Sequence, residues 1–267
     1  MRSASASGKI ILSGEYAVLF GKSGIAIPSE LRVKVMLEES QKNDGMTIVW
    51  AEKNIDVTWK DYAKKIAQKI VERTKNISGT LTIENKLPLG KGMGSSTALI
   101  IAMCRCIVGP DSESIARELE DELNPGHSGI DFAVIWEEKP ILFAKDTTPT
   151  VIDLPKNLLQ NMRLIDTGKP NEATPELVAW VRARYEAGEP ETRNAIEIIG
   201  ACTERILADE SIKTVMRDHH RAQITLGVVL KETQRVIADI EHRGGSAKVL
   251  GAGGRTGGGG MVLVLPA

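Results

Sequence analysis

Three glycines and two serines between positions 88 and 98 form the most distinctive chemical pattern in this chain. The segment reads Pro-Leu-Gly-Lys-Gly-Met-Gly-Ser-Ser-Thr-Ala, and an apolar stretch typical of a helix spans residues 97–108. Glycine lets a backbone approach a ligand closely and adopt positive φ. Free N–H groups and the dipole at a helix start attract anions, most often phosphate. The pattern predicts a phosphate-binding loop, and a glycine-rich turn capped by Ser95 is the open alternative.

Two common nucleotide-binding motifs do not fit this chain. A Walker A loop ending at Gly21-Lys22-Ser23 would need a glycine at position 16, where Tyr16 stands. A dinucleotide-binding fingerprint would need a third glycine where Ser95 stands. The protein-kinase His-Arg-Asp and Asp-Phe-Gly elements are absent as well. The glycine-rich segment therefore belongs to another class of loop.

Three segments together resemble the motifs of the GHMP small-molecule kinases. Residues 88–98 resemble the phosphate-binding motif of that family. Residues 8–19 look like its first, substrate-side motif, and residues 247–254 are similar to its third. Because the motifs follow the family's order across nearly the whole chain, the chain is identified as a member of this family.

A fourth segment resembles the mevalonate kinases within the family. Residues 127–131 read His-Ser-Gly-Ile-Asp, similar to the element that carries their catalytic aspartate, and residues 164–168 also look like a mevalonate kinase segment. The resemblance implies ATP-dependent phosphorylation of the primary hydroxyl of mevalonate, in isoprenoid precursor synthesis. Phosphomevalonate kinase is the alternative on the same scaffold. A catalytically inactive paralogue that binds a nucleotide or metabolite is the alternative from another class.

The resemblance assigns roles to residues that lie far apart in the sequence. Asp131 would take or orient the proton of the acceptor hydroxyl, and Lys9 would favour the charged aspartate and stabilise the attacking oxygen. Glu120 and the hydroxyl of Ser95 or Ser96 would bind Mg²⁺, with Ser96 preferred. The expected ATP-binding residues are Pro88, Gly90, Lys91, Gly92, Met93, Gly94, Ser95 and Ser96, and the expected substrate-binding residues are Lys9, Glu15, Tyr16, Asp131 and Ala252.

Some polar residues have ordinary surface explanations. Residues 118–122 include four acidic side chains, so Glu120 also fits a solvated helix face. His219, His220 and His242 show no metal-like spacing with carboxylates and are predicted to lie on the surface.

The departures from the family pattern concern the acceptor side. Tyr16 stands where mevalonate kinases usually carry histidine, and we expect its hydroxyl to donate a hydrogen bond to the substrate. Lys22, Lys169 or backbone N–H groups would hold the mevalonate carboxylate. The third motif is extended by Arg255, Thr256 and four glycines, which affects the shape of the adjacent pocket wall.

The composition predicts a globular protein of the cytoplasm. The chain has 267 residues, of which 42% are hydrophobic and 26% charged. A net charge of −1 and 4% aromatic residues give no indication of nucleic-acid or membrane partners. We expect no membrane helix and no secretory leader, and we expect the three cysteines to be buried and reduced. The oligomeric state is open, with a homodimer as one option.

The elements that must position these residues indicate an α+β fold. Apolar or alternating runs predict strands at 9–12, 16–20, 32–38, 46–51, 55–57, 80–84, 132–136, 140–144, 162–166, 247–250 and 261–265. Helical spacing predicts helices at 61–75, 97–108, 111–123, 175–186, 190–208 and 211–242, the last bent at Gly227. The resemblance implies an N-terminal lobe like ribosomal protein S5 domain 2 at 1–157 and a ferredoxin-like C-terminal lobe at 158–267.

Overall fold

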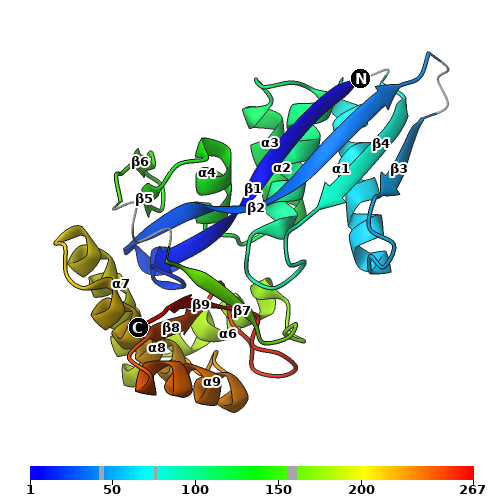
Figure 1. The fold of residues 1–267 in the computed structure, drawn as a ribbon. Coiled ribbons are helices and arrows are strands. Elements are labelled where there is room, and N and C mark those ends of the chain that lie inside the picture. The colour runs from blue at the N-terminus through cyan, green and yellow to red at the C-terminus, as the bar shows by residue number, and fades with distance from the viewer. Residues whose placement is uncertain (42–44, 75–76, 155–160) are drawn as a thin grey trace.

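A long antiparallel pair of strands runs through the molecule. The computed structural model describes residues 1–41, 45–74, 77–154 and 161–267. Strand β1 (Arg2–Ser13) pairs with β2 (Ser23–Glu39) from Arg2 opposite Leu37 to Ser13 opposite Ile25. Figure 1 shows this pair crossing from the N-terminal part towards the C-terminal helices. The pair therefore supplies residues to both parts.

The larger sheet has six strands, and four helices pack with it. Its order is β3 (Met46–Trp50), β4 (Gly79–Asn85), β2, β5 (Ile141–Ala144) and β6 (Thr150–Val151), and β1 joins it through β2. The helices are α1 (Val57–Thr74), α2 (Ser95–Ile107), α3 (Glu113–Leu123) and α4 (Ile130–Glu137). Most of α2 is buried, as expected for an apolar helix in the centre of a core.

Three of the predicted strands are wrong. Residues 132–136 lie in helix α4, which is buried on several sides, and a short apolar run of this kind has no periodicity that separates helix from strand. Residues 17–20 form a short 3-10 helix, η1 (Ala17–Phe20). Residues 55–57 form no strand, because α1 begins at Val57.

In the described residues of the C-terminal part, a small sheet is combined with four helices. Strands β7 (Arg163–Asp166), β9 (Met261–Leu265) and β8 (Ser246–Val249) pair antiparallel in that order. The helices are α6 (Thr174–Glu186), α7 (Pro190–Leu207), α8 (Ile212–Thr225) and α9 (Lys231–His242). The long helix expected at 211–242 is divided into two at Gly227, whose φ is +74°.

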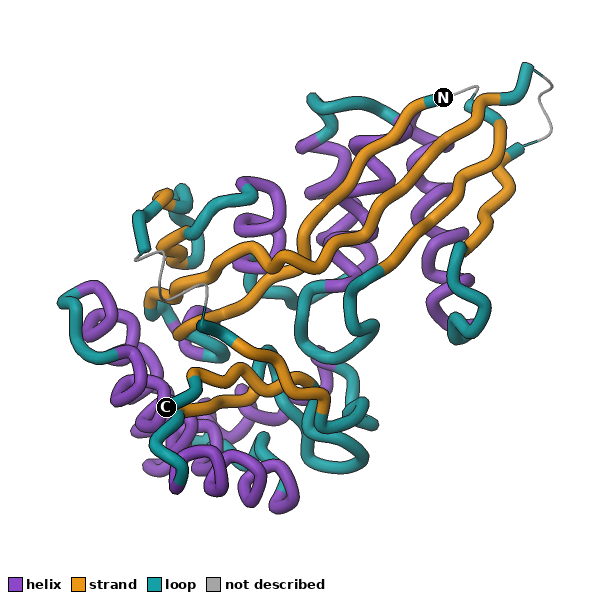
Figure 2. The backbone as a smooth tube through the Cα atoms, viewed as in Figure 1, coloured by secondary structure: helices purple, strands orange, loops and turns teal. Residues whose placement is uncertain are grey.

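The α+β class is confirmed, and the two parts are packed against each other. Helix α7 contacts β1 and β2 near Ser13 and Ser23, and α8 contacts β1. The same region can be followed in Figure 2. The predicted boundary at 157/158 falls within residues 155–160, outside the described part of the chain. Among the described residues, no helix is long and apolar enough to cross a membrane.

Candidate active site

A cavity of about 570 Å³ lies where the three motif segments meet. This volume is in the range typical of small-molecule sites. The walls come from the end of β1, the glycine-rich loop, the segment before α4, residues 169–175 and the third motif. The predicted residues that line it are Lys9, Glu15, Tyr16, Gly90, Lys91, Gly92, Gly94, Ser95, Ser96, Glu120, Asp131 and Ala252.

Lys9 and Asp131 form an ion pair at this cavity. Strand β1 carries Lys9 into the interior, where its side chain is 3% exposed, and Asp131 lies in the first turn of α4. The Lys9 Nζ atom is 3.0 Å from Asp131 Oδ1, and the aspartate side chain is 31% exposed. The helix start also favours a negative charge at this position. A buried cation thus faces a carboxylate that a substrate hydroxyl can reach.

The glycine-rich loop is held tightly by the other two motifs. A Cβ atom on Gly92 would lie 2.5 Å from the Leu250 carbonyl oxygen, and one on Gly94 would lie 2.9 Å from Lys9 Cγ. Both glycines have positive φ. The Gly90 N–H donates to Ser95 Oγ at 3.2 Å. The loop therefore presents the start of α2 to the cavity in a conformation that requires glycine.

Two predicted nucleotide-binding residues are not part of the described cavity wall. Pro88 and Met93 are both absent from it. The Met93 side chain is fully buried in a core cluster with Leu250, and its carbonyl accepts the N–H of Lys9 at 3.0 Å. Met93 therefore anchors the loop to the core, because its apolar side chain is packed in the interior and does not face the cavity.

Glu120 is buried, so the solvated-face interpretation is wrong for this residue. Its carboxylate accepts hydrogen bonds from Thr97 Oγ1 at 2.8 Å and Asn124 Nδ2 at 3.0 Å. Burial, together with the nearby charge of Asp131, raises the pKa of Glu120 to about 6. The other acidic residues of the segment, Glu118, Asp121 and Glu122, are exposed as expected of a helix face.

The surroundings of Glu120 fit a magnesium ion. Burial is the main cause of the raised pKa of this carboxylate and the charge of Asp131 adds to it, so a bound cation would favour the charged form that burial disfavours. Ser96, at the start of α2, lines the same cavity. Within the described residues no cluster of three or more histidine, cysteine or carboxylate ligands occurs. Mg²⁺ does not require such a cluster, because one or two carboxylates, phosphate oxygens and water can fill its coordination sphere.

Glu15 and Tyr16 contact the C-terminal part through their polar atoms. The Glu15 carboxylate is paired with Lys248 of β8, and His219 Nε2 of α8 lies 3.0 Å from its second oxygen. Burial raises the pKa of Glu15, but Lys248 and His219 lower it to a net value of about 2. The Tyr16 hydroxyl donates to the Ala252 carbonyl at 2.6 Å. Both residues line the cavity, yet these polar groups already have protein partners.

Two of the three histidines predicted on the surface are buried. His219 and His220 lie on the inner side of α8, whereas His242 is exposed as expected. Burial lowers the pKa of both buried rings. Their sequence context contains no signal for this, because the partner of His219 lies more than 200 residues earlier in the chain.

The two lysines considered for the substrate carboxylate are placed differently. Lys22 pairs with Glu197 at 2.5 Å and is not among the described residues of the cavity wall. Lys169 lines the cavity, and its Cε atom lies near Gly90. Only Lys169 remains a candidate of the two.

The extension of the third motif packs against the segment that contains Lys169. The N–H groups of Arg255 and Thr256 donate to Glu172 Oε2 at 3.1 and 3.3 Å. The Gly258 N–H donates to the Lys169 carbonyl at 2.8 Å. The extension therefore shapes the cavity wall at residues 169–175, and Ala252 lines the same cavity.

Three supporting residues were not predicted. Thr97 and Asn124 hold the Glu120 carboxylate, and Lys248 neutralises Glu15. The spacing of Asn124, four residues after Glu120, is a signal that could have found it. Thr97 and Lys248 have no local signal, since they reach their partners only through tertiary contacts.

This chain is similar in sequence to known kinases. Residues 61–135 match the GHMP kinases N terminal domain. The chain is 28% identical over 263 residues to the mevalonate kinase of Archaeoglobus fulgidus, covering 94% of this chain and 89% of that protein.

Solved structures extend the similarity over the whole chain. The Methanococcus jannaschii mevalonate kinase superposes with a TM-score of 0.81 at 20% identity, covering 99% of this chain and 90% of that one. The L. major mevalonate kinase in complex with R-mevalonate gives a TM-score of 0.80 at 17% identity, with coverages of 100% and 87%. The chain therefore matches the GHMP kinases N terminal domain over residues 61–135 and is similar in sequence and fold to the mevalonate kinases along nearly its whole length.

Proposed function

We propose that this protein transfers the γ-phosphate of ATP to the primary hydroxyl of mevalonate. The observation that carries the proposal is the contact of 3.0 Å between buried Lys9 and accessible Asp131, which opens onto a cavity bounded by the glycine-rich loop. The similarity to mevalonate kinases along nearly the whole chain supports the same reaction.

The residues at the cavity can divide the work of phosphoryl transfer. Asp131 accepts a hydrogen bond from the acceptor hydroxyl and takes its proton, while the positive charge of Lys9 stabilises the developing alkoxide. The N–H groups of the loop and of the start of α2 bind the phosphates. Glu120 and Ser96 would hold Mg²⁺, which supplies positive charge to the polyphosphate when it is bound.

The charges along the cavity favour an acceptor with a single negative group. Lys9 is paired with Asp131, and Lys91 is paired with Asp166. Among the lysines in the described wall, Lys169 forms no ion pair within 4.0 Å, although its charge acts on the nearby Asp56 carboxylate. A phosphomevalonate phosphate would need more cations or N–H donors than one lysine supplies. We therefore expect at least roughly tenfold higher kcat/KM for mevalonate than for phosphomevalonate.

The test measures ADP release by the purified protein with mevalonate, phosphomevalonate, galactose and homoserine in parallel. Fastest turnover of mevalonate supports the proposal. Faster turnover of phosphomevalonate would replace it with the phosphomevalonate kinase alternative, and ATP binding without turnover of any acceptor would indicate an inactive paralogue.

All three cysteines are buried and unpaired, which supports action in the reducing cytoplasm.

A further inference from the structure

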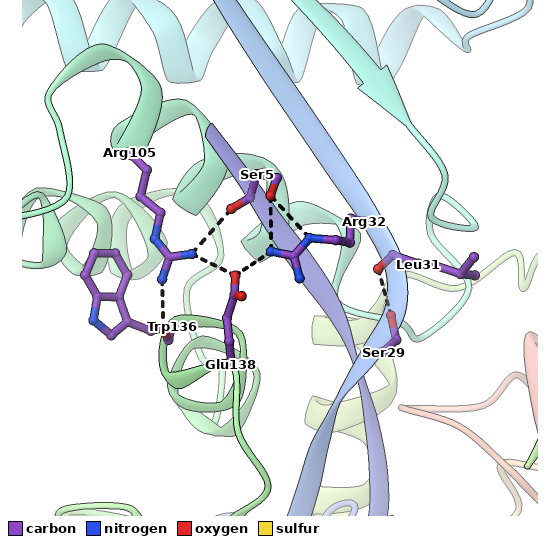
Figure 3. Close-up of polar contacts among 7 residues, drawn as sticks. All are labelled: Ser5, Ser29, Leu31, Arg32, Arg105, Trp136 and Glu138. Carbon is purple, nitrogen blue, oxygen red and sulfur yellow. Dashed lines mark hydrogen bonds and ion pairs between the residues drawn. The ribbon is translucent and has the colours of Figure 1, made fainter. Parts of the chain in front are cut away.

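Helices α2 and α4 both begin at the cavity, and their far ends meet in a cluster of charged residues. Ser95 opens α2, and Asp131 lies in the first turn of α4. At the opposite ends, Arg105 Nη1 donates to the Glu138 carboxylate at 2.9 Å, and Arg105 Nη2 donates to the Trp136 carbonyl at 2.8 Å (Figure 3). Arg105 therefore ties the end of α2 to the end of α4.

The same cluster includes strand β1. Arg32 Nη2 donates to the Glu138 oxygen at 2.7 Å and to Ser5 Oγ at 3.1 Å, as Figure 3 shows. Ser5 lies on β1, four residues before Lys9. The cluster thus connects the helix that carries Asp131 with the strand that carries Lys9.

The two connections have similar lengths. Glu138 follows Asp131 by seven positions, which corresponds to about 10 Å along a helix. Lys9 follows Ser5 by four positions, which corresponds to at most about 13 Å along a strand, because the pairing with β2 shifts register between Ser7 and Lys9. Helix α4 and β1 therefore form two sides of a frame, with the Lys9–Asp131 contact at one end and the charged cluster at the other. A helix of two turns moves as a unit, so a shift at Glu138 displaces Asp131.

The backbone conformation at position 138 indicates that a glutamate occurs there because of its carboxylate. Glu138 follows α4 with φ 52° and ψ 31°, in the left-handed region. Residues with a Cβ atom avoid this region, and glycine is the usual choice at such a helix end. A glutamate here contradicts the local preference, and two arginines bind its carboxylate. Its carboxylate therefore has a role that a glycine could not fill.

We propose that Arg105, Arg32 and Glu138 form a positioning cluster that sets the Asp131 carboxylate relative to Lys9 and the reacting hydroxyl. None of the three is among the described residues that line the cavity. They act through α4 and β1 and do not touch the substrate. The inference rests on the proposed function, since its effect is exerted on Asp131.

The first test replaces Glu138 by glycine. Glu138→Gly removes the carboxylate, while glycine adopts the left-handed backbone without strain. We expect kcat to fall roughly 10- to 100-fold, the scale of a displacement of about 1 Å at a reacting group. The KM values for ATP and mevalonate should change by no more than about twofold, because the binding groups are untouched. Arg105→Lys should lose less kcat than Arg105→Met.

Arg184 provides a matched control in the other part of the molecule. It donates to the Glu189 carboxylate at 2.6 Å and to the Leu226 carbonyl at 2.9 Å, and it lies 4.7 Å from the Trp180 ring centroid. Arg105 makes the same three types of contact with Glu138 and Trp136. Arg184→Met should therefore lower thermal stability about as much as Arg105→Met, with kcat within about twofold of wild type.

A double variant decides whether the cluster acts through Asp131. In an Asp131→Asn background, Glu138→Gly should cause little further loss of residual kcat, because residues acting through one group are not additive. Fully additive losses of kcat in the double variant would overturn the inference, and so would a kcat for Glu138→Gly within about twofold of wild type. Turnover of mevalonate by the wild type would uphold the proposed function in either case. Should another alcohol prove to be the acceptor, the same ratios measured with it decide the cluster separately.

Discussion

Two lysine–carboxylate pairs lie near each other in this protein, and they differ in exposure. Lys9 and Glu15 belong to the same motif, yet their partners are Asp131 in the N-terminal part and Lys248 in the C-terminal part. The Asp131 side chain is 31% exposed at the cavity, whereas the Glu15 side chain is only 2% exposed. Access of a substrate to the acidic partner therefore separates a pair that can do chemistry from a pair that joins the two parts.

The buried Glu15–Lys248 pair should be the more important of the two for stability. Lys248→Met leaves the Glu15 carboxylate buried without its ammonium partner, so we expect the free energy of unfolding to fall by about 3–5 kcal/mol. Urea denaturation measures this loss. The double variant Glu15→Gln, Lys248→Met should recover more than half of it, because no unpaired charge remains. A loss below about 1 kcal/mol would show that the pair behaves like an exposed one.

The same pair should make stability depend on acid. The pKa of Glu15 is about 2, below its ordinary value of 4.5. A carboxylate whose pKa is lowered by folding stabilises the protein above the unfolded value, and this contribution is lost as the pH falls from about 4.5 to about 2. The shift corresponds to about 3 kcal/mol. Urea denaturation at pH 5 and at pH 2.5 should show a smaller difference for Glu15→Gln than for wild type; equal differences would contradict the assignment.

The Lys9–Asp131 pair, which faces the cavity, should be the more important of the two for turnover. Asp131→Asn removes the proton acceptor but keeps an oxygen that faces Lys9, so kcat should fall by roughly 10² or more. ATP affinity should be preserved, and the free energy of unfolding should fall less than in Lys248→Met. Steady-state kinetics, ATP titration and urea denaturation measure these quantities. A correctly folded Asp131→Asn protein with near-normal kcat would remove this residue from the mechanism.

Glu120 extends the comparison to a third carboxylate, which is buried and has no lysine partner among the described residues. Glu120→Gln should raise the Mg²⁺ concentration for half-maximal rate by roughly tenfold, since one charged ligand is lost. In the wild type this concentration should rise as the pH falls below about 6, the pKa of Glu120, because a protonated carboxyl does not bind Mg²⁺. Magnesium titrations at pH 5.5 and 7.5 test both points. A titration of the variant identical to that of wild type would place the metal elsewhere.

Tyr16 gives the smallest expected effect. Its hydroxyl donates to the Ala252 carbonyl across the two parts, so Tyr16→Phe should cost about 0.5–1.5 kcal/mol of stability. The KM for mevalonate should change by less than about twofold, in contrast to the substrate contact expected from the sequence. Thermal denaturation and steady-state kinetics measure the two quantities. A large rise in KM with unchanged stability would return the hydroxyl to the substrate.

The catalytic candidates were recognisable because short contiguous segments define them. The glycine-rich loop, the Ser-Gly-Ile-Asp element and the segment around Lys9 each carry their own signature, and their order along the chain identified the family. The α+β class and most helices followed from periodicity. Their roles at the site remain predictions.

The tertiary structure decided which polar residues face the cavity. Glu120 and Glu118 look alike in the sequence, but only Glu120 is buried against Thr97. Helix α4 was expected as a strand, because burial on several sides removes the periodicity that would reveal it.

The contrast between Glu15 and Asp131 has the same origin. The amino-acid sequence by itself determined that Lys9, Glu15, Asp131 and Lys248 occur in the motifs. Lys248 lies 233 residues from Glu15 in the chain, and only folding brings them together. The energy of a charge depends on its solvation and its neighbours, and these are properties of the packed structure. Local residue patterns therefore determined which groups are available for chemistry, and packing of the two parts decided which of them a substrate can reach.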